Sequence, residues 1–292
     1  MKCLAHWNAS LVSVVDGEHT VNQKGGALMD DSEIAKLADV LEEASRTGVP
    51  IEPLSTTFPT LDILSAYRVQ GEGIRRRVGA GAVLKGHKVG LTSAAMQSQL
   101  GVDQPDAGCL LSDMFYPERE PVPVGSFIQP RVEPEIAFVL DAPLAGPGAT
   151  VADAARAVGY VMGSIELIDS RIQDWQITIG DTIADNASCG GVVLGGTFRR
   201  LSEVDLALTA VVVRRNGLVV ASGAGGAVMG TPLAALAWLA NLLAERGESL
   251  SSGQVVLPGS LTVSVPASEG DTFEATFSGL GSVVVSFAGG DK

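Results

Sequence analysis

Two carboxylates stand one residue apart in the stretch RVEPEIAFVL, residues 131–140. If this stretch forms a β-strand, its side chains alternate between two faces, so Glu133 and Glu135 project to one side while Ile136 and Phe138 project to the other. Two acids that share a small, partly dry volume raise each other's pKa or bind a cation, and a divalent metal ion is the usual partner. The pair therefore predicts a metal site on this strand.

A third acid, Glu166, lies in the apolar run GSIELI. A buried carboxylate needs a partner, because an unpaired charge is costly in apolar surroundings. With Glu133 and Glu135 it would supply three monodentate oxygen ligands and leave positions for water and a chelating substrate, as expected of an open Mg²⁺ or Mn²⁺ site. A salt bridge from Glu166 to Arg131 or Arg171 is an equally good explanation at this point.

Two further segments carry polar groups in apolar or glycine-rich surroundings. GHKVGLTS, residues 86–93, places Lys88 at the end of an apolar run, where a buried ammonium pairs with an acid or contributes charge to a site. DTIADNASCGG, residues 181–191, contains Ser188, which together with backbone amides near Gly190 could bind a carboxylate. A loop whose Asp and Asn side chains bond their own backbone explains the second segment too, and from the pattern alone it is favoured.

The histidine and the cysteines are weaker candidates. His87 is expected to form a structural hydrogen bond rather than bind metal, because no second His stands at ligand spacing. Cys3, Cys109 and Cys189 lie far apart with no CxxC spacing, which argues against a disulfide framework or structural zinc and favours a reducing, cytoplasmic setting. Cys109 and Cys189 are expected to be small core residues, since neither has a neighbouring His that would lower its pKa.

The composition is that of a globular protein with an acidic charge balance. A chain of 292 residues can bury a sizeable core, as one large domain or a main domain with a smaller companion. The formal charge of -13 argues against nucleic acid or an anionic membrane surface as partner. No stretch is expected to reach the roughly 18 to 20 continuous apolar residues that span a bilayer. Residues 1–28 lack the features of a secretory signal and are expected to be a poorly ordered upstream extension.

The elements that must position these residues follow from hydrophobic periodicity. Helical spacing predicts a helix over residues 31–47, and a second helix is expected to be capped by Thr60 and to end before Gly79. A strand is expected around residues 82–89. After about residue 120, short β-branched runs broken by Gly and Pro indicate a strand-rich region.

Two later elements are defined by their local signals. Asn216-Gly217 between two β-branched runs predicts a tight type I′ hairpin. Thr231 as the cap and Pro232 as the first helical residue predict a helix that ends at Gly247. Closing strands are expected at residues 255–257, 261–265, 271–277 and 282–287. The pattern is that of an α+β chain dominated by a folded sheet.

Several motifs, taken in order, resemble the 2-keto-4-pentenoate hydratase family within the fumarylacetoacetate hydrolase C-terminal-like superfamily. They are GHKVGLTS, GVDQPDAG, QPRVEPEIAFVL, IELIDSRIQDW, DTIADNASCG and MGTPLAALAWLANLL, and the resemblance spans about residues 30–288. It implies an α+β fold with a mixed β-roll core and a small N-terminal helical region. Residues 29–100 would hold the helical region and the first strand, and residues 101–292 the β-rich catalytic domain.

The resemblance also implies roles for single residues. The ligands of the divalent cation would be Glu133, Glu135 and Glu166. Lys88 in KVGLT and Asp106 in QPDAG match positions beside the substrate, and we expect them to share the acid and base work. Ser188 in DNAS matches a contact to the substrate carboxylate, and Leu91 in KVGLT matches a substrate-binding position. The resemblance therefore favours a substrate-binding role for Ser188 over the simple loop that the pattern alone favoured.

The family implies an activity and a setting. Its members hydrate 2-hydroxypenta-2,4-dienoate to a 4-hydroxy-2-oxo acid in the meta-cleavage catabolism of aromatic compounds. The resemblance thus implies a cytoplasmic, homo-oligomeric hydro-lyase that uses Mg²⁺, with Mn²⁺ as a substitute, on a small 2-hydroxydienoate or 2-oxo acid, with no nucleic acid or membrane partner. Ala107 stands where the family usually carries an aromatic residue, which predicts a wider pocket and a substrate with a longer alkyl chain or a second carboxylate.

Two alternatives stay open. A 4-oxalocrotonate decarboxylase is a sister enzyme with nearly the same metal site, and it would also need a cation for the distal carboxylate of its substrate. A non-catalytic metal-binding protein on this fold would keep the three acids and lose Lys88 or Asp106. Both residues are present, which disfavours the second alternative.

Overall fold

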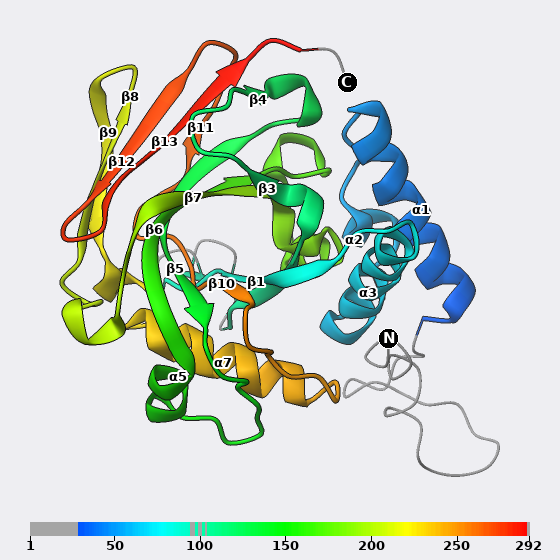
Figure 1. The fold of residues 1–292 in the computed structure, drawn as a ribbon. Coiled ribbons are helices and arrows are strands. Elements are labelled where there is room, and N and C mark those ends of the chain that lie inside the picture. The colour runs from blue at the N-terminus through cyan, green and yellow to red at the C-terminus, as the bar shows by residue number, and fades with distance from the viewer. Residues whose placement is uncertain (1–28, 94–96, 99–100, 103, 291–292) are drawn as a thin grey trace.

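The computed structural model describes residues 29–290 apart from 94–96, 99–100 and 103. The predicted upstream extension, residues 1–28, lies outside this part of the chain. Two β-sheets form the body of the protein, and the helices lie beside and below the larger sheet in the view of Figure 1. The α+β architecture expected from the sequence is confirmed.

The larger sheet has eight strands and is strongly curved (Figure 1). Its order is β2-β1-β10-β5-β6-β7-β3, with β11 paired to β5. The strands are β1 (Leu84–Gly90), β2 (Asp106–Leu111), β3 (Phe115–Tyr116), β5 (Arg131–Leu140), β6 (Val158–Ile168), β7 (Cys189–Arg199), β10 (Val255–Leu257) and β11 (Val265–Pro266). Strands far apart in the chain, such as β1 and β10, therefore lie side by side.

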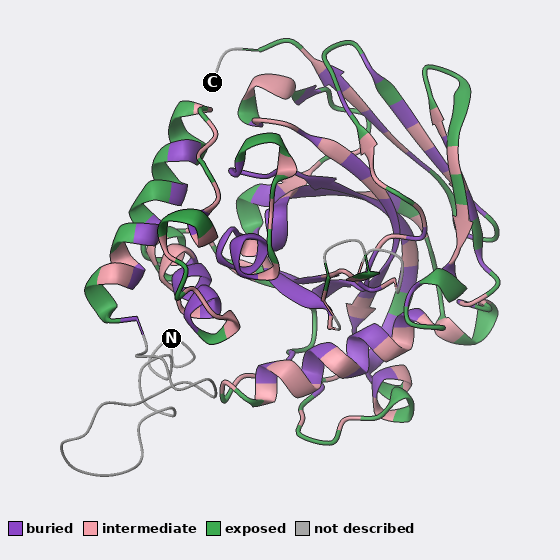
Figure 2. Ribbon diagram, turned by 180° about the vertical axis from the view of Figure 1, so that it is seen from behind, coloured by how far each residue is buried: buried purple, intermediate pink, exposed green. Residues whose placement is uncertain are grey.

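The smaller sheet covers one face of the larger one. Its five strands are β4 (Val122–Pro123), β13 (Gly281–Ala288), β12 (Thr272–Phe277), β8 (Ala210–Arg215) and β9 (Leu218–Ala224), in that spatial order. Ile136 and Phe138 of β5 are fully buried in the same apolar core as Phe273 of β12. The buried residues follow the inner strands and the inward sides of the helices (Figure 2). The apolar face of β5 thus packs on the second sheet, which leaves Glu133 and Glu135 on the other face.

The helices are α1 (Asp31–Thr47), α2 (Leu54–Thr57), α3 (Ile63–Gly79), α5 (Val151–Ala157), α6 (Ile179–Ala184) and α7 (Pro232–Ala244). The first helix has the predicted bounds, and Gly48 ends it in the left-handed conformation at φ 72°. The expected cap of the second long helix is wrong. Asp62 caps α3 by accepting a hydrogen bond from the Ser65 N–H at 2.8 Å, and Thr60 lies in the preceding turn. The boundary predicted between residues 100 and 101 stays a prediction.

The hairpin prediction is confirmed, because Asn216 and Gly217 join β8 to β9 with φ values of 52° and 83°. Pro232 is the first residue of α7 as expected, but the Thr231 side chain makes no capping hydrogen bond. The helix also ends before Gly247, at Ala244. Three of the four closing strands are present as expected, whereas the run at 261–265 contributes only the start of the short strand β11.

One segment, Gly225–Ala244, is apolar and long enough to cross a membrane by length and composition, so the expectation that no stretch would reach this length is wrong. The segment comprises a short turn and α7, which packs beside α5 and buries Leu236 and Leu239 in the main core. It is therefore a core helix of this fold.

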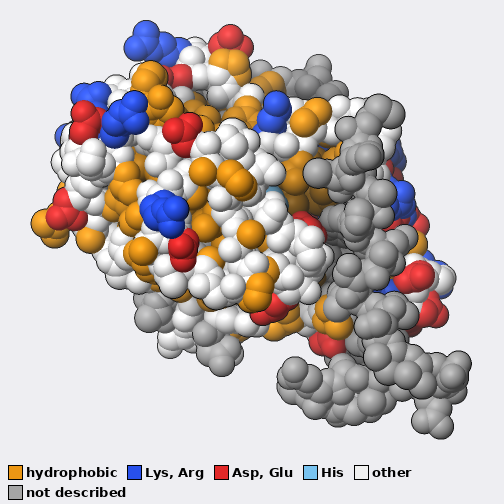
Figure 3. Space-filling view, turned by 60° about the horizontal axis from the view of Figure 1, so that its bottom comes forward, with side chains coloured by type: hydrophobic (Ala, Val, Ile, Leu, Met, Phe, Trp, Pro, Cys, Tyr) orange, Lys and Arg blue, Asp and Glu red, His pale blue; other side chains and the backbone are white. Residues whose placement is uncertain are grey.

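On the face shown in Figure 3, basic and acidic side chains lie interspersed among small apolar areas.

Candidate functional site

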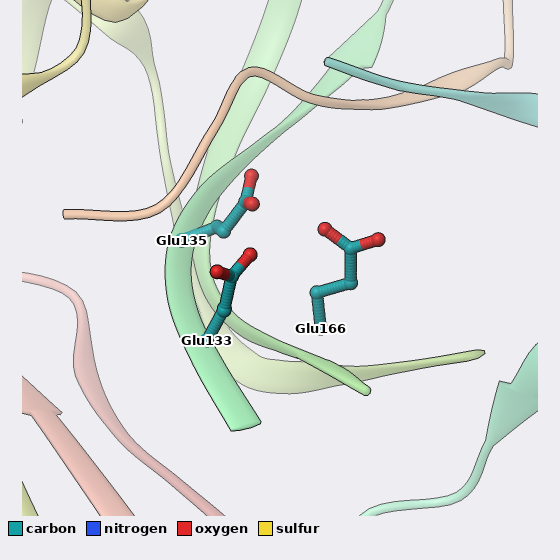
Figure 4. A group of neighbouring side chains, drawn as sticks. All are labelled: Glu133, Glu135 and Glu166. Atoms are coloured by element: carbon teal, nitrogen blue, oxygen red, sulfur yellow. The ribbon is translucent and has the colours of Figure 1, made fainter. Parts of the chain in front are cut away.

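The three predicted acidic ligands come together on two neighbouring strands. Glu133 of β5 lies directly opposite Glu166 of β6, and Glu135 is two residues further along the same face of β5. One carboxylate oxygen from each lies within 4.8 Å of the others, and the side chains point into a common volume (Figure 4). The predicted strand geometry therefore holds. The salt bridges considered for Glu166 do not form, since its cationic neighbour is Lys88 and not Arg131 or Arg171.

The carboxylate oxygens of this cluster fit a hard cation. Glu135 and Glu166 are fully buried, and Glu135 Oε1 and both oxygens of Glu166 have no hydrogen-bond partner within the described ranges. Glu135 Oε2 accepts a hydrogen bond from the Gly259 N–H at 2.7 Å. Buried acceptors without donors need a compensating positive charge. Together with the half-buried Glu133 carboxylate they form a donor set that suits Mg²⁺ or a similar divalent ion.

Burial and mutual repulsion perturb the acids in the same direction. Burial and the charge of Glu166 raise the pKa of Glu133 to about 7. Burial and the same neighbour raise the pKa of Glu135 well above its ordinary value, and burial raises the pKa of Glu166 although Lys88 opposes the shift. At neutral pH the cluster therefore requires protons or a cation.

Lys88 supplies positive charge beside this cluster. Its Nζ lies 3.4 Å from Glu166 Oε1 and donates a hydrogen bond to the Ala187 carbonyl at 2.9 Å. Burial alone would lower the pKa of Lys88, but Glu166, Asp106 and Glu133 raise it above the ordinary value. Lys88 is therefore an ammonium in the resting site, where it can donate a proton or offset negative charge.

Asp106 shares the face of the sheet that carries Lys88. It lies opposite Gly90 in the antiparallel β1–β2 pair, and its Oδ2 accepts a hydrogen bond from Thr182 Oγ1 at 3.1 Å. A Cβ at Gly90 would lie 2.2 Å from Asp106 Oδ1 and 3.2 Å from Lys88 Nζ, so only glycine leaves room for both side chains. Burial raises the pKa of Asp106, while Lys88 and Thr182 oppose the shift.

Ala107 lies on the other face of β2. It pairs with Val89 and is buried in the apolar core, and its N–H donates to the Tyr67 hydroxyl at 3.1 Å. Alternation along the strand thus directs its side chain away from Asp106. The structure argues against the wider pocket expected at this position.

Ser188 lies in a left-handed turn, Asn186–Ser188. Three successive residues adopt φ values of 54°, 52° and 53°, a conformation that non-glycine residues rarely take. The Asn186 side chain holds the turn against β2, because it accepts from the Cys109 N–H at 2.7 Å and donates to the Cys109 carbonyl at 3.0 Å. The turn thereby presents the Ala187 carbonyl to Lys88 and places Ser188 Oγ 3.4 Å from Thr182 Oγ1.

A buried ion pair supports this turn from behind. The Arg171 guanidinium bonds the Asp185 carboxylate and donates to the Asp185 carbonyl at 2.7 Å, and its backbone N–H donates to the same carboxylate at 2.9 Å. Burial raises the pKa of Asp185 to about 6, although Arg171 opposes the shift. The sequence pattern assigned no place in the site to Thr182, Asp185 or Asn186. The signal that could have found them is the polar run DTIADN between apolar segments.

The other candidates are placed as follows. Leu91 follows β1 at φ 55°, and its carbonyl accepts from Gln97 Nε2 at 2.8 Å; its contact with substrate stays a prediction.

His87 is buried, and neither ring nitrogen has a hydrogen-bond partner in the part of the chain described, so the expected structural hydrogen bond is not found there. Burial lowers the pKa of His87 to about 4 and raises that of Cys109 to about 12. Burial also raises the pKa of Cys189, which is a buried core residue as expected, whereas Cys109 is only partly buried.

Comparisons with known proteins identify the family. Residues 78–288 match the fumarylacetoacetate (FAA) hydrolase C-terminal family. The chain is 46% identical over 255 residues to the TodF product hydratase of Pseudomonas putida, covering 87% of this chain and 95% of the relative. It is 42% identical over 250 residues to the 2-keto-4-pentenoate hydratase of Paraburkholderia xenovorans, covering 86% of this chain and 93% of the relative.

A solved structure has the same fold. The 4-oxalocrotonate decarboxylase of Pseudomonas putida G7, complexed with magnesium and adipate, superposes with a TM-score of 0.87 at 39% identity. The match covers 89% of this chain and 98% of the decarboxylase. With the motifs, the fold and the acidic cluster in agreement, the chain belongs to the fumarylacetoacetate hydrolase C-terminal family, in its 2-keto-4-pentenoate hydratase group.

Proposed function

We propose that this protein is a metal-dependent hydro-lyase that adds water to 2-hydroxypenta-2,4-dienoate, or to a longer 2-hydroxydienoate, and yields a 4-hydroxy-2-oxo acid. One observation carries the proposal. A cluster of three carboxylates, two of them buried, lies with the ammonium of Lys88 and the carboxyl of Asp106 on one side of the curved sheet, in a chain whose relatives are hydratases. This set combines a cation site with groups that can move protons.

Glu133, Glu135 and Glu166 would hold Mg²⁺, with Mn²⁺ as a substitute. The unpartnered buried oxygens of Glu135 and Glu166 support this assignment, as does the magnesium of the decarboxylase complex. When bound, the cation stabilises negative charge on the substrate's carboxylate and 2-oxygen.

The residues around the cluster would act on the rest of the substrate. Ser188 binds the carboxylate, and Leu91 contacts the substrate at the end of β1. Lys88 offsets negative charge as the proton of the 2-hydroxyl leaves and a proton is delivered to C5, which gives an α,β-unsaturated 2-oxo acid. Water then adds its oxygen at C4 and its proton at C3. Lys88 and Asp106 share these proton transfers, because both are buried and lie on the same face of β1 and β2.

We infer further that the enzyme acts in the cytoplasm, in the meta-cleavage catabolism of aromatic compounds, and assembles as a homo-oligomer. The apolar side chains of Leu218 and Val219 on the edge strand β9 are 74% and 61% exposed, which supports a protein contact there.

One observation favours a second candidate, a 4-oxalocrotonate decarboxylase. Arg131 lies on the same face of β5 as Glu133, with its guanidinium carbon 5.1 Å from the centre of the Trp175 ring. It also donates to Ser264 Oγ at 3.2 Å. A cation at this end of the strand could hold the distal carboxylate of a dicarboxylate substrate.

An ultraviolet assay separates the candidates. Freshly generated 2-hydroxypenta-2,4-dienoate and a 2-hydroxymuconate-type dicarboxylate are incubated with and without Mg²⁺, and the products are identified by mass. Magnesium-dependent gain of one water by the monoacid supports the hydratase. Release of carbon dioxide from the dicarboxylate supports the decarboxylase. No turnover of either acid or of longer dienoates, with Ca²⁺ bound as tightly as Mg²⁺, would overturn both in favour of a non-catalytic metal-binding protein.

A further inference from the structure

The buried hydroxyl of Thr182 lies between two of the proposed site residues. Thr182 Oγ1 donates to Asp106 Oδ2 at 3.1 Å and lies 3.4 Å from Ser188 Oγ. All three side chains are buried, and Asp106 Oδ1 has no hydrogen-bond partner within the described ranges. The group expected to move a proton is thus connected through one hydroxyl to the group expected to bind the substrate carboxylate.

Hydrogen bonds from α3 and α2 fix the strand β2 and the helix α6 that flank this hydroxyl. Gln70 of α3 is buried, and its Nε2 donates to the Ala107 carbonyl at 2.8 Å and to the Ile183 carbonyl at 2.9 Å. These carbonyls belong to the residues that follow Asp106 and Thr182, so one amide fixes the spacing between β2 and α6. Asp181 ties the same helix to α2 through hydrogen bonds from the Ser55 N–H at 2.9 Å and the Ser55 hydroxyl at 2.8 Å.

The hydroxyl chemistry gives this connection a direction. A threonine hydroxyl has one proton to donate and lone pairs to accept with. When Asp106 is ionised, Thr182 must donate to it, and the Ser188 hydroxyl then donates to Thr182. When Asp106 carries a proton, it can donate to Thr182, and Thr182 donates to Ser188. Only in the second arrangement is the Ser188 proton free for the substrate carboxylate.

We propose that Thr182 is a positioning residue that couples the protonation state of Asp106 to the direction of the Ser188 hydroxyl. The inference rests on the proposed function, in which Asp106 moves a proton and Ser188 binds the carboxylate. No bond between heavy atoms changes, because one proton enters or leaves Asp106 and two hydroxyl protons turn. The carboxylate is held while Asp106 is protonated and is released when Asp106 gives its proton up.

Other titratable groups also interact with Asp106, and the test must leave them unchanged. They are Lys88 on β1, Glu133 on β5 and the Tyr67 hydroxyl on α3. Thr182→Val removes the hydroxyl at nearly constant shape, and Thr182→Ser keeps it. Thr276→Val is the matched control, because its hydroxyl pairs with Ser282 on the second sheet.

The experiment measures kcat and KM of the Mg²⁺-loaded enzyme with 2-hydroxypenta-2,4-dienoate, and the affinity for 2-oxopentanoate by calorimetry. Loss of a hydrogen bond to a charged group predicts that Thr182→Val lowers kcat/KM by about 10- to 100-fold. Thr182→Ser and Thr276→Val are expected to stay near the wild type. In a Ser188→Ala background, Thr182→Val should further weaken 2-oxopentanoate binding far less than it does in the wild type, because the two groups act as one unit.

Three outcomes would overturn the inference. They are an unchanged Thr182→Val enzyme, a Thr182→Ser enzyme as impaired as Thr182→Val, and additive effects in the Thr182–Ser188 cycle. If Thr182→Val does not fold by circular dichroism, Thr182→Ala replaces it in the same comparison. If the wild type turns over no dienoate, the proposed function is refuted and the coupling is not. The 2-oxopentanoate affinities of the single and double variants still decide whether Thr182 and Ser188 are coupled.

Discussion

Glu133 and Glu166 face each other directly across the β5–β6 ladder, so two carboxylates occupy a cross-strand position that normally favours apolar or oppositely charged pairs. This pair is unfavourable for the sheet by itself and favourable for a cation between the strands. The like-charged pair thus destabilises the sheet at the position where it provides ligands for a cation.

Glu133→Gln separates these two effects. It removes one ligand, and we expect loss of magnesium-dependent turnover with an intact fold. Because it also removes like-charge repulsion, the metal-free variant should be more stable than the metal-free wild type by up to about 1 kcal/mol. Turnover assays measure the loss of activity, and urea unfolding with and without Mg²⁺ measures the change in stability. An unchanged rate would remove Glu133 from the site.

The stability of the metal-free protein should fall as the pH rises from about 4.5 to about 7. The folded chain holds protons on its acids that the unfolded chain releases, since burial raises the pKa of Glu133 to about 7 and also raises those of Glu135 and Glu166. We expect the free energy of unfolding to drop by about 1–3 kcal/mol across this window. Urea titrations in a chelator should record the drop, and Mg²⁺ should restore stability at pH 7.5. A rise in metal-free stability over the same window would contradict the assignment.

Lys88→Met should lower kcat by about 10²- to 10⁴-fold, because the site loses a proton donor and the ammonium beside Glu166. Lys85→Met is the matched control, since Lys85 is an exposed residue of the same strand. Steady-state kinetics of both variants test the role. Equal losses in the two variants would point to an effect on β1 as a whole.

Gly90→Ala should impair turnover without unfolding the protein. The new methyl group would lie 2.2 Å from Asp106 Oδ1 and 3.2 Å from Lys88 Nζ, so the Asp106 carboxylate must shift from its position. Gly79→Ala at the end of α3 is the control, because within the described residues no atom apart from its chain neighbours and its own helix backbone lies within 4 Å of the added Cβ. We expect kcat of Gly90→Ala to fall by at least about tenfold, since misplaced groups lose much of their catalytic effect. The kcat of Gly79→Ala should not change. Retained activity in Gly90→Ala would show that Asp106 tolerates displacement.

Asn186 offers a test of the left-handed turn. Asn186→Gly keeps the backbone conformation accessible and removes both hydrogen bonds to Cys109, whereas Asn186→Ala also strains the backbone at φ 54°. We expect Asn186→Ala to be less stable than Asn186→Gly by about 1 kcal/mol. Thermal unfolding of the two variants compares them, and equal stability would mean that the turn carries no strain.

Local patterns predicted much of this structure. The alternation in RVEPEIAFVL placed Glu133 and Glu135 on one face, and Asn216-Gly217 fixed a hairpin, because neither feature depends on distant residues. Thr60 and Asp62 are both good cap residues, and only the observed hydrogen bond to Ser65 distinguishes them.

Long-range contacts could not be predicted in this way. Thr182 lies 76 residues from Asp106, and Gln70 lies 113 residues from Ile183. Periodicity carries no information about such pairs, since they depend on how sheets and helices pack. The pattern around Lys88 singled out that residue, and the resemblance to a family added Asp106, but neither pointed to the hydroxyl between Asp106 and Ser188.

The Gln70 amide has a consequence for protein engineering. Because one side chain of α3 bonds the carbonyls of Ala107 and Ile183, the N-terminal helices belong to the scaffold of the reaction centre. Lys88 also comes from β1, which lies between β2 and β10 in the large sheet. A chimera that grafts residues 101–292 of this chain onto another relative's N-terminal part would keep the three acids and lose the native source of Lys88. Such a chimera can be active only if the relative's N-terminal part supplies an equivalent lysine and an equivalent side-chain amide that bonds both carbonyls.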